Sequence, residues 1–197
     1  MLQYIIRGSN AQEIINTATS ALNYGCRWIR LNLRELAPTE IDTTIKTLQA
    51  KCNYIEAYLS IENDVKNVAR LKVAGIHLGD DSNISAVDTR KQLGEEPIIG
   101  ITVSEATEIP FIPRAAIDYI AVASDNLNIC RKVVEQMHAI GLEEPVVAPY
   151  SYATSLKTLM ATGINGIAVQ HSNTSAIELP KLLKELYDIM EKRLEDI

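Results

Sequence analysis

The sequence is built from two kinds of segment that alternate along its length. Short apolar runs rich in Ile and Val recur at intervals of roughly 25 residues. Each run is too short to form an independent helix, and its continuous apolar character is typical of parallel strands buried on both faces. The sequence therefore predicts strands over Gln3–Arg7, Arg27–Asn32, Tyr54–Ser60, Gly75–Leu78, Pro97–Val103, Asp118–Ala123, Pro145–Ala148 and Asn165–Gln170.

The segments between these runs have apolar residues three and four positions apart, which is the pattern of an amphipathic helix. They predict helices over Ala11–Asn23, Thr39–Cys52, Asp64–Lys72, Ile84–Leu93, Leu127–Ile140, Tyr152–Ala161 and Ser175–Ile197. The remaining connection, Ser104–Ile117, contains Pro110 and Pro113. Because proline breaks the hydrogen bonding of a helix interior, this connection has room for a short helix at most.

Eight strands, each followed by a helical or nearly helical segment, predict a compact (β/α)₈ TIM barrel. We expect one such domain over residues 1–197, because no linker or low-complexity segment interrupts the alternation. The alternative is an open, doubly wound sheet. However, the first strand is not followed by the Gly-x-Gly-x-x-Gly motif of dinucleotide-binding sheets, and the alternation continues to eight strands.

The composition of the chain indicates which classes of partner and which cellular compartment to expect. Asp and Glu (25) outnumber Lys and Arg (19), and no basic cluster is present, which argues against nucleic acid as a partner. No apolar run reaches roughly 18 residues and no signal-peptide pattern is seen, which argues against a membrane. Cys26, Cys52 and Cys130 are widely spaced, so we expect buried thiols and a cytoplasmic protein.

In the predicted barrel, functional residues lie at the carboxyl ends of the strands, where the active sites of this fold are found. The candidate ligand-binding residues at these ends are Arg7, Arg30, Asn32, Arg34, Thr102, Tyr150, Ser151 and His171. The three arginines either face an anionic ligand or form salt bridges that close the barrel mouth. His77, within the fourth strand, is expected to point into the barrel as a hydrogen-bonded structural residue.

Acidic residues follow the third and fourth predicted strands. Glu62, Asp64 and Asp81, with Asp80 beside them, could converge as oxygen ligands for Mg²⁺. Magnesium favours one or two protein carboxylates together with substrate phosphate. The alternative is helix capping, because both acidic segments directly precede a predicted helix, where Asp, Asn and Ser are preferred.

Five stretches of the chain resemble one known family. IENDVKNVARLKVAGIHLG, at 61–79, is similar to the segment between the third and fourth strands of thiamine phosphate synthases and the related thiazole tautomerases. EPIIGIT, DYIAV, PVVA and TGINGIAV continue the resemblance in order, so that it covers nearly the whole chain. The family's synthase joins a pyrimidine pyrophosphate to a thiazole phosphate, with Mg²⁺ and loss of pyrophosphate. The resemblance therefore implies a transferase of thiamine biosynthesis, a small phosphorylated ligand, Mg²⁺ and a homodimer.

Several positions differ from the pattern of that family. Arg30-Leu31-Asn32-Leu33-Arg34 stands where the family reads Gln-Leu-Arg-Glu-Lys, and Glu62-Asn63-Asp64 stands where it reads Asn-Asp-Arg. Tyr150-Ser151 replaces a Gly-Gly pair whose backbone N–H groups approach phosphate. The resemblance thus implies a divergent member with a much altered phosphate site. Two alternatives stand beside it: a barrel repurposed for a different small molecule, and a non-catalytic barrel that serves a protein partner.

Overall fold

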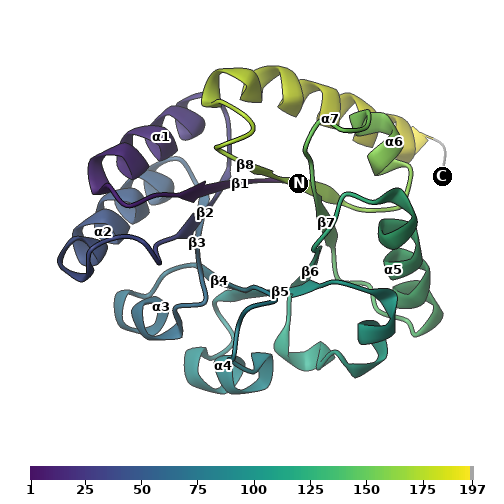
Figure 1. Cartoon of the computed structure of the whole chain (residues 1–197), viewed down its shortest axis with the longest axis horizontal. Coiled ribbons are helices and arrows are strands. Elements are labelled where there is room, and N and C mark those ends of the chain that lie inside the picture. Colours follow the sequence, from purple (N-terminus) through teal and green to yellow (C-terminus); the bar gives the residue numbers. More distant parts are fainter. Residues whose placement is uncertain (196–197) are drawn as a thin grey trace.

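Eight parallel strands close into a barrel in the order of the sequence, with β1 paired to both β2 and β8 (Figure 1). This is a computed structural model, and it describes residues 1–195. The strands are β1 (Leu2–Arg7), β2 (Trp28–Asn32), β3 (Tyr58–Glu62), β4 (Gly75–Leu78), β5 (Ile98–Val103), β6 (Tyr119–Val122), β7 (Val146–Pro149) and β8 (Gly166–Gln170). The predicted (β/α)₈ TIM barrel is confirmed.

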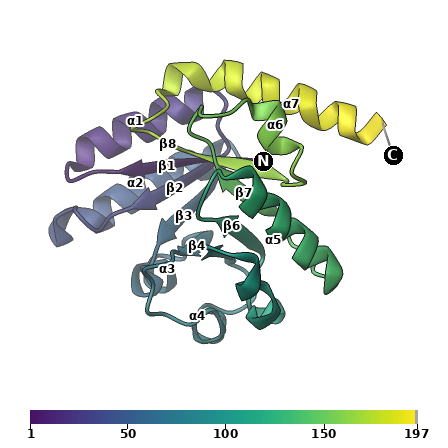
Figure 2. The same ribbon diagram turned by 45° about the vertical axis from the view of Figure 1, so that its right-hand side comes forward.

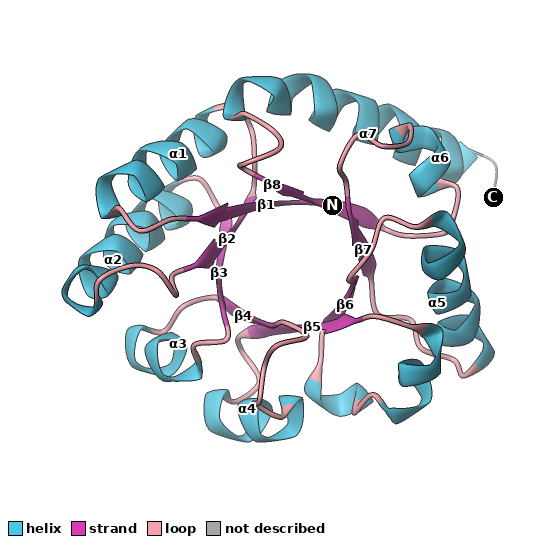
Figure 3. Cartoon of the chain, viewed as in Figure 1, coloured by secondary structure: helices cyan, strands magenta, loops and turns pink. Residues whose placement is uncertain are grey.

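Helices surround the barrel on the outside (Figure 3). They are α1 (Ala11–Asn23), α2 (Pro38–Tyr54), α3 (Val65–Leu71), α4 (Ala86–Leu93), α5 (Leu127–Ala139), α6 (Leu156–Met160) and α7 (Leu179–Glu195). The connection after β5 forms two short 3₁₀ turns, η1 (Ala106–Phe111) and η2 (Arg114–Ala116), as its prolines predict. A third turn, η3 (Ala176–Glu178), precedes α7, which lies across the outside of β8 and packs against α6 (Figure 2). Residues 196–197 of the last predicted helix lie outside the described residues.

Several predicted boundaries differ from the structure by one to four residues, and two of the larger errors have a local cause. The run beginning at Tyr54 continues α2, and β3 begins four positions later at Tyr58, because Glu56 adopts a left-handed backbone (φ 55°) that separates the two elements. Glu62 therefore lies at the end of β3 rather than in the loop beyond it. Helix α6 is shorter than predicted, because Tyr152 is also left-handed (φ 64°) and the Ser155 side chain caps the helix.

Alternation along the strands divides their side chains between two environments. Outward-facing residues pack against the helices and form the main core, with Ile29, Ile61, Ile76 and Ile99 almost fully buried. The barrel interior holds a second, smaller apolar cluster around Tyr119, Ala121 and Val147. In TIM barrels the interior is packed with side chains, and here part of that packing is polar: Gln3, Arg30, Ser60 and His77 are all buried.

Gly100 makes room for a large side chain of the interior, Tyr119. A Cβ atom at this position would lie 2.0 Å from Cζ of Tyr119, a distance at which the ring could not keep its place. The absence of a side chain on β5 thus lets the tyrosine of β6 cross the barrel toward His77 on β4, whose Nδ1 lies 2.7 Å from the Tyr119 hydroxyl oxygen. Across the described residues, no helix is long and apolar enough to cross a membrane.

A candidate ligand site at the barrel mouth

The carboxyl ends of the strands surround a cavity of about 190 Å³, at the place where the barrel fold predicts a functional site. Small or apolar residues of β6, β7 and β8 form much of its wall, including Ala121, Val147 and Ala168. Arg30, Thr102 and Gln170 contribute polar groups from β2, β5 and β8, and Asp80 contributes a carboxylate from the loop after β4. The cavity therefore combines a smooth apolar wall with a few polar groups, as small-molecule sites commonly do.

A buried ion pair lies beside this cavity. Arg30 Nε donates a hydrogen bond to Oε1 of Glu62 (2.7 Å), and the two side chains are 10% and 9% exposed. Asn32 Nδ2 donates to the second carboxylate oxygen, Oε2, and Arg30 Nη1 donates to Oε1 of Gln3 at 3.5 Å. Register explains the grouping, because Arg30 lies opposite Ser60, two residues before Glu62 on the same face of β3. Both oxygens of the Glu62 carboxylate are thus engaged within the barrel.

His77 links the barrel floor to the cavity wall. Its Nδ1 lies 2.7 Å from the Tyr119 hydroxyl oxygen and its Nε2 lies 2.8 Å from Oγ1 of Thr102. Complete burial, followed in importance by the charge of Arg30, holds the pKa of His77 well below its usual value, so the ring is neutral. Burial also raises the pKa of Tyr119, to about 12. The histidine is hydrogen-bonded and points into the barrel, as predicted.

A second ion pair lies on the rim of the mouth and is exposed. Arg34 on the loop after β2 pairs with Asp81, whose other carboxylate oxygen accepts a hydrogen bond from Asn63 Nδ2 at 2.9 Å. Hydrogen bonding to Arg34 lowers the pKa of Asp81, and the same contact raises the pKa of Arg34. Asn63 also accepts a hydrogen bond from the backbone N–H of Gly79 (2.9 Å), so the rim joins the loops after β2, β3 and β4.

The carboxylates predicted as magnesium ligands do not fit a metal site in this arrangement. Glu62 is paired with Arg30, and Asp81 is paired with Arg34. Asp64 caps α3, accepting hydrogen bonds from the backbone and side-chain nitrogens of Asn67 at 3.0 and 2.6 Å. Among residues 1–195, no group of three or more His, Cys, Asp and Glu side chains is placed to hold a metal. Magnesium stays a prediction from the family resemblance, and no step is assigned to it.

Several predicted residues lie around the mouth without lining its cavity. The Ser151 hydroxyl donates to Asp125, which ties the loops after β6 and β7 together. Tyr150 is 7% exposed and packs against Tyr152, with ring centroids 4.6 Å apart. His171 Nδ1 lies 2.7 Å from the Tyr4 hydroxyl oxygen, on the helix-facing side of the barrel wall. These contacts connect the loops of this half of the rim to one another.

Of the predicted ligand-binding residues, Arg30 and Thr102 line this cavity, whereas Asn32 and Arg34 line a separate hollow of about 330 Å³ between the loops after β2 and β3. Arg7 is exposed at the end of β1, in register with Asn32. Asp80 and Gln170, both expected at strand ends, also line the cavity, and so do Ile5 and Pro149, which were not predicted. Strand alternation was the available signal for these last two: each lies two residues from another inward-facing position, whereas the prediction took the last polar residue of a strand whatever its face.

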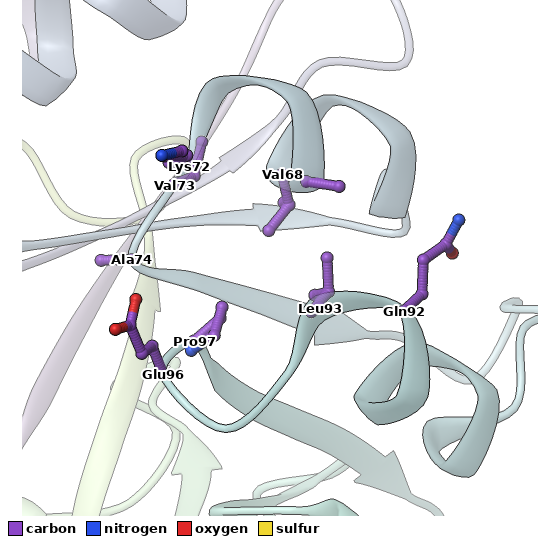
Figure 4. A pocket seen from close by; sticks show the side chains of 9 residues that line it. Val68, Lys72, Val73, Ala74, Gln92, Leu93, Glu96 and Pro97 are labelled. Carbon is purple, nitrogen blue, oxygen red and sulfur yellow. The ribbon is translucent and has the colours of Figure 1, made fainter.

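A larger hollow, of about 320 Å³, lies at the opposite end of the barrel (Figure 4). It is enclosed by the ends of α3 and α4 and by the segments leading into β4 and β5, with Val68 and Leu93 on its sides. Lys72 and Glu96 are the charged side chains at its edge. Because the amino-terminal face of this fold serves stability rather than catalysis, the smaller mouth cavity with its buried polar groups is the better candidate.

Comparison with known proteins identifies the family of the chain. The sequence profile of the family described as "Thiamine monophosphate synthase" matches residues 3–173, so the chain belongs to that family, as its resemblance predicted. A thiamine-phosphate synthase of Bacteroides fragilis is 28% identical over 202 residues, covering 95% of this chain and 98% of its own length. One of Bacteroides thetaiotaomicron is 28% identical over 182 residues, covering 85% and 87%.

The solved structures give the same fold. Thiamine phosphate pyrophosphorylase from Pyrococcus furiosus superposes with a TM-score of 0.77 and 22% sequence identity, over 96% of this chain and 95% of that chain. This likeness concerns the arrangement of strands and helices, since identity at this level is too low to equate the residues of two sites.

Proposed function

We propose that the protein is a transferase of the thiamine-phosphate synthase type, which joins a pyrimidine pyrophosphate to a thiazole phosphate at the barrel mouth. The observation that carries this proposal is similarity over nearly the full length of relatives named thiamine-phosphate synthase. A cavity at the carboxyl ends of the strands, lined by Arg30 and Thr102, supports it.

The proposed phosphate site differs from that of the family. Tyr150 and Ser151 stand where the family has two glycines, and a Cβ at each position restricts the close backbone approach that phosphate binding uses. Arg7 and Arg34 on the rim are the cations available for phosphate in its place. Guanidinium groups bind phosphate through paired hydrogen bonds, so side chains rather than backbone N–H groups hold the phosphates in this proposal.

The test is product formation by the purified protein. Both thiamine precursors and Mg²⁺ are supplied, and thiamine phosphate is measured by chromatography. We expect the wild type to form product and Thr102→Val to form at least tenfold less, since it loses a polar group of the cavity. Arg70→Gln is the matched control, because Arg70 pairs with Asp42 on the outside of the barrel. Absence of thiamine phosphate at high protein concentration would contradict the proposal.

A second candidate function is binding of a different small molecule without this transfer. Two observations favour it: each carboxylate predicted for magnesium is engaged by another side chain, and the cavity is small. Its 190 Å³ is below the roughly 300–1,000 Å³ typical of sites for drug-sized ligands. Ligand binding without turnover, measured on the same preparation, distinguishes the two. A homodimer and a cytoplasmic location belong to the first proposal, and the mass in solution tests the dimer.

A further inference from the structure

We propose that one flank of α7, together with α6, binds the same surface of a second copy of this chain, with the two α7 helices antiparallel. This surface, the α7 flank, consists of Lys157 and Ala161 of α6 and of Glu185, Asp188, Ile189, Lys192 and Arg193 of α7. The interface gives a surface to the homodimer of the proposed function, but it does not depend on the transfer reaction.

A hollow of about 470 Å³ lies between α6 and the carboxyl-terminal half of α7, on the outside of the barrel. Figure 2 shows α7 running past α6 toward the carboxyl end of the chain. Another side of α7 is already packed: Leu182 and Leu186 are 3% and 4% exposed, and Arg193 Nη1 donates to the carbonyl oxygen of Ile164 at 2.9 Å. The helix is thus fixed to the barrel on that side, whereas a hollow remains on its flank toward α6.

Two apolar residues form the floor of this hollow. Ile189 packs against the main core but stays partly exposed, and Ala161 is exposed. The methylene stems of Lys157 and Lys192 add apolar surface beneath their charges. A helix lying in the hollow would remove this surface from water, which favours association.

The charged residues around the floor are balanced. Glu185 and Asp188 are acidic, Lys157 and Lys192 are basic, and no two of these four described side chains form an ion pair with each other. Arg193, the fifth charged residue, is held by the carbonyl of Ile164. The α7 flank therefore offers two acidic and two basic groups to a partner, and a partner with the same set can pair with all of them.

The order of the charges along α7 determines the direction of that partner. Glu185, Asp188, Ile189 and Lys192 lie three or four positions apart, so they share one face of the helix, acidic toward the amino end and basic toward the carboxyl end. A parallel second helix would bring like charges together. About a two-fold axis beside Ile189, each Glu185 instead faces Lys192 of the second copy, as an interface that uses the same surface twice requires.

Charge reversal tests the interface, because the two reversed variants are complementary to each other. In Lys192→Glu two acidic side chains meet, and in Glu185→Lys two lysines meet. Each variant is expected to dimerise at least about tenfold more weakly than the wild type, because like charges then face each other at both pairs. An equimolar mixture of the two restores opposite charges and is expected to associate as tightly as the wild type. Sedimentation velocity over the micromolar range measures the dissociation constants.

Lys184→Glu is the matched control. Lys184 is exposed on α7 but does not line the hollow, so the variant has the charge change of Lys192→Glu outside the proposed interface. We expect it to dimerise like the wild type. A wild type that stays monomeric, a mixture that does not associate, or equal weakening by Lys184→Glu would overturn the proposal.

Two further measurements keep the test independent of folding and of the transfer reaction. For the wild type alone, raising the salt concentration from about 0.05 to 0.5 M is expected to weaken dimerisation several-fold, and a dissociation constant that does not change would contradict the proposed ion pairs. Thiamine phosphate formation is measured separately, because the α7 flank does not line the mouth cavity. A wild-type dimer without product contradicts only the proposed function, and product formation by a monomeric wild type contradicts only the interface.

Discussion

The two halves of the barrel interior are constructed differently. On the side of β2 to β5, side-chain hydrogen bonds join Arg30 to Glu62 and His77 to Thr102. On the side of β6 to β8, small apolar residues such as Ala168 line the cavity. In the first half, the hydrogen-bond donors and acceptors determine which side chains fit together. In the second half, the volume of the side chains is the main constraint. For the proposed ligand we therefore expect polar recognition to depend on the first half, and the second half to limit the ligand's shape.

Two ion pairs at the mouth differ in how far they are buried. The side chains of Arg30 and Glu62 are 10% and 9% exposed, whereas those of Arg34 and Asp81 are 65% and 52% exposed. A charge that loses its partner in the interior has no water to replace it, but one on the rim is hydrated at once. Two ion pairs of the same kind are thus expected to differ in their contribution to stability, and substitution of one partner in each pair measures that difference.

Breaking the interior pair has the largest expected effect on stability. Glu62→Ala leaves the Arg30 guanidinium buried without a counter-charge, and we expect the free energy of unfolding to fall by about 3–5 kcal/mol. Urea denaturation measures this change. Asp81→Ala is the matched control and is expected to leave the urea midpoint nearly unchanged, because its pair is exposed. Equal losses in the two variants would show that burial does not separate the two pairs.

Gly100→Ala tests the contact between His77 and Tyr119, which joins the two halves, by adding a methyl group without changing any charge. The added Cβ would lie 2.0 Å from the Tyr119 ring, so the ring must move or the strands must separate. We expect a loss of about 1–3 kcal/mol of unfolding free energy, together with a weakened His77–Tyr119 contact. Gly8→Ala serves as the control, because its nearest contact is an ordinary 3.5 Å to Ile14. A Gly100→Ala variant as stable as Gly8→Ala contradicts the packing described for Tyr119.

Most of the fold could be predicted from the sequence, because its signal is repeated. Eight apolar runs at similar spacing leave few arrangements, and an error in one of them does not change the topology. The error at β3 shows the limit: Tyr54 and Ile55 are favourable in a strand, but α2 takes Tyr54 and Ile55 follows as its C-cap. Periodicity cannot place the boundary between two apolar elements that adjoin without a glycine or proline.

The site could be predicted only in part, because the direction of a side chain depends on the register between strands. The sequence places Tyr150, Ser151 and His171 at strand ends, but not on the inner or the outer face of the wall. The pairing of Arg30 with Glu62 joins residues 32 positions apart and depends on the register of β2 with β3. Such contacts follow from the closed barrel rather than from any local pattern.

The dependence of stability on pH tests the environment of His77 in the polar half of the interior. Its pKa is lower in the folded than in the unfolded protein, so the unfolded state binds more protons as the pH falls below about 6.5. Stability is therefore expected to decrease from pH 7 to 5.5, by up to about 1 kcal/mol per pH unit from this one group. The Met1 amine also has a lowered pKa, so the comparison is with His77→Gln, which removes the His77 part alone.

Asp42 and Asp81 do not interfere in this range, since the pKa values of these two carboxyls lie below 3.8. Substitution of the exposed His138 to Gln is the control and is expected to retain the wild-type pH dependence. Should His77→Gln and the wild type lose stability in parallel between pH 7 and 5.5, the neutral, buried histidine described here would be wrong.

Metal titration tests the exposed ion pair of Arg34 and Asp81, where we expect the smallest effect of substitution. Arg34 occupies Asp81 in the structure, so a metal at Asp81 must displace that guanidinium. We expect Arg34→Ala to bind Mn²⁺ a few-fold more tightly than the wild type, and Asp81→Ala to bind it most weakly, as measured by the paramagnetic relaxation of water. The change is modest because an exposed ion pair is weak competition for a metal. Identical Mn²⁺ affinities in all three proteins would remove Asp81 from any metal site. The other two predicted ligands would then also be insufficient, since Asp64 caps α3 and Glu62 is held by Arg30.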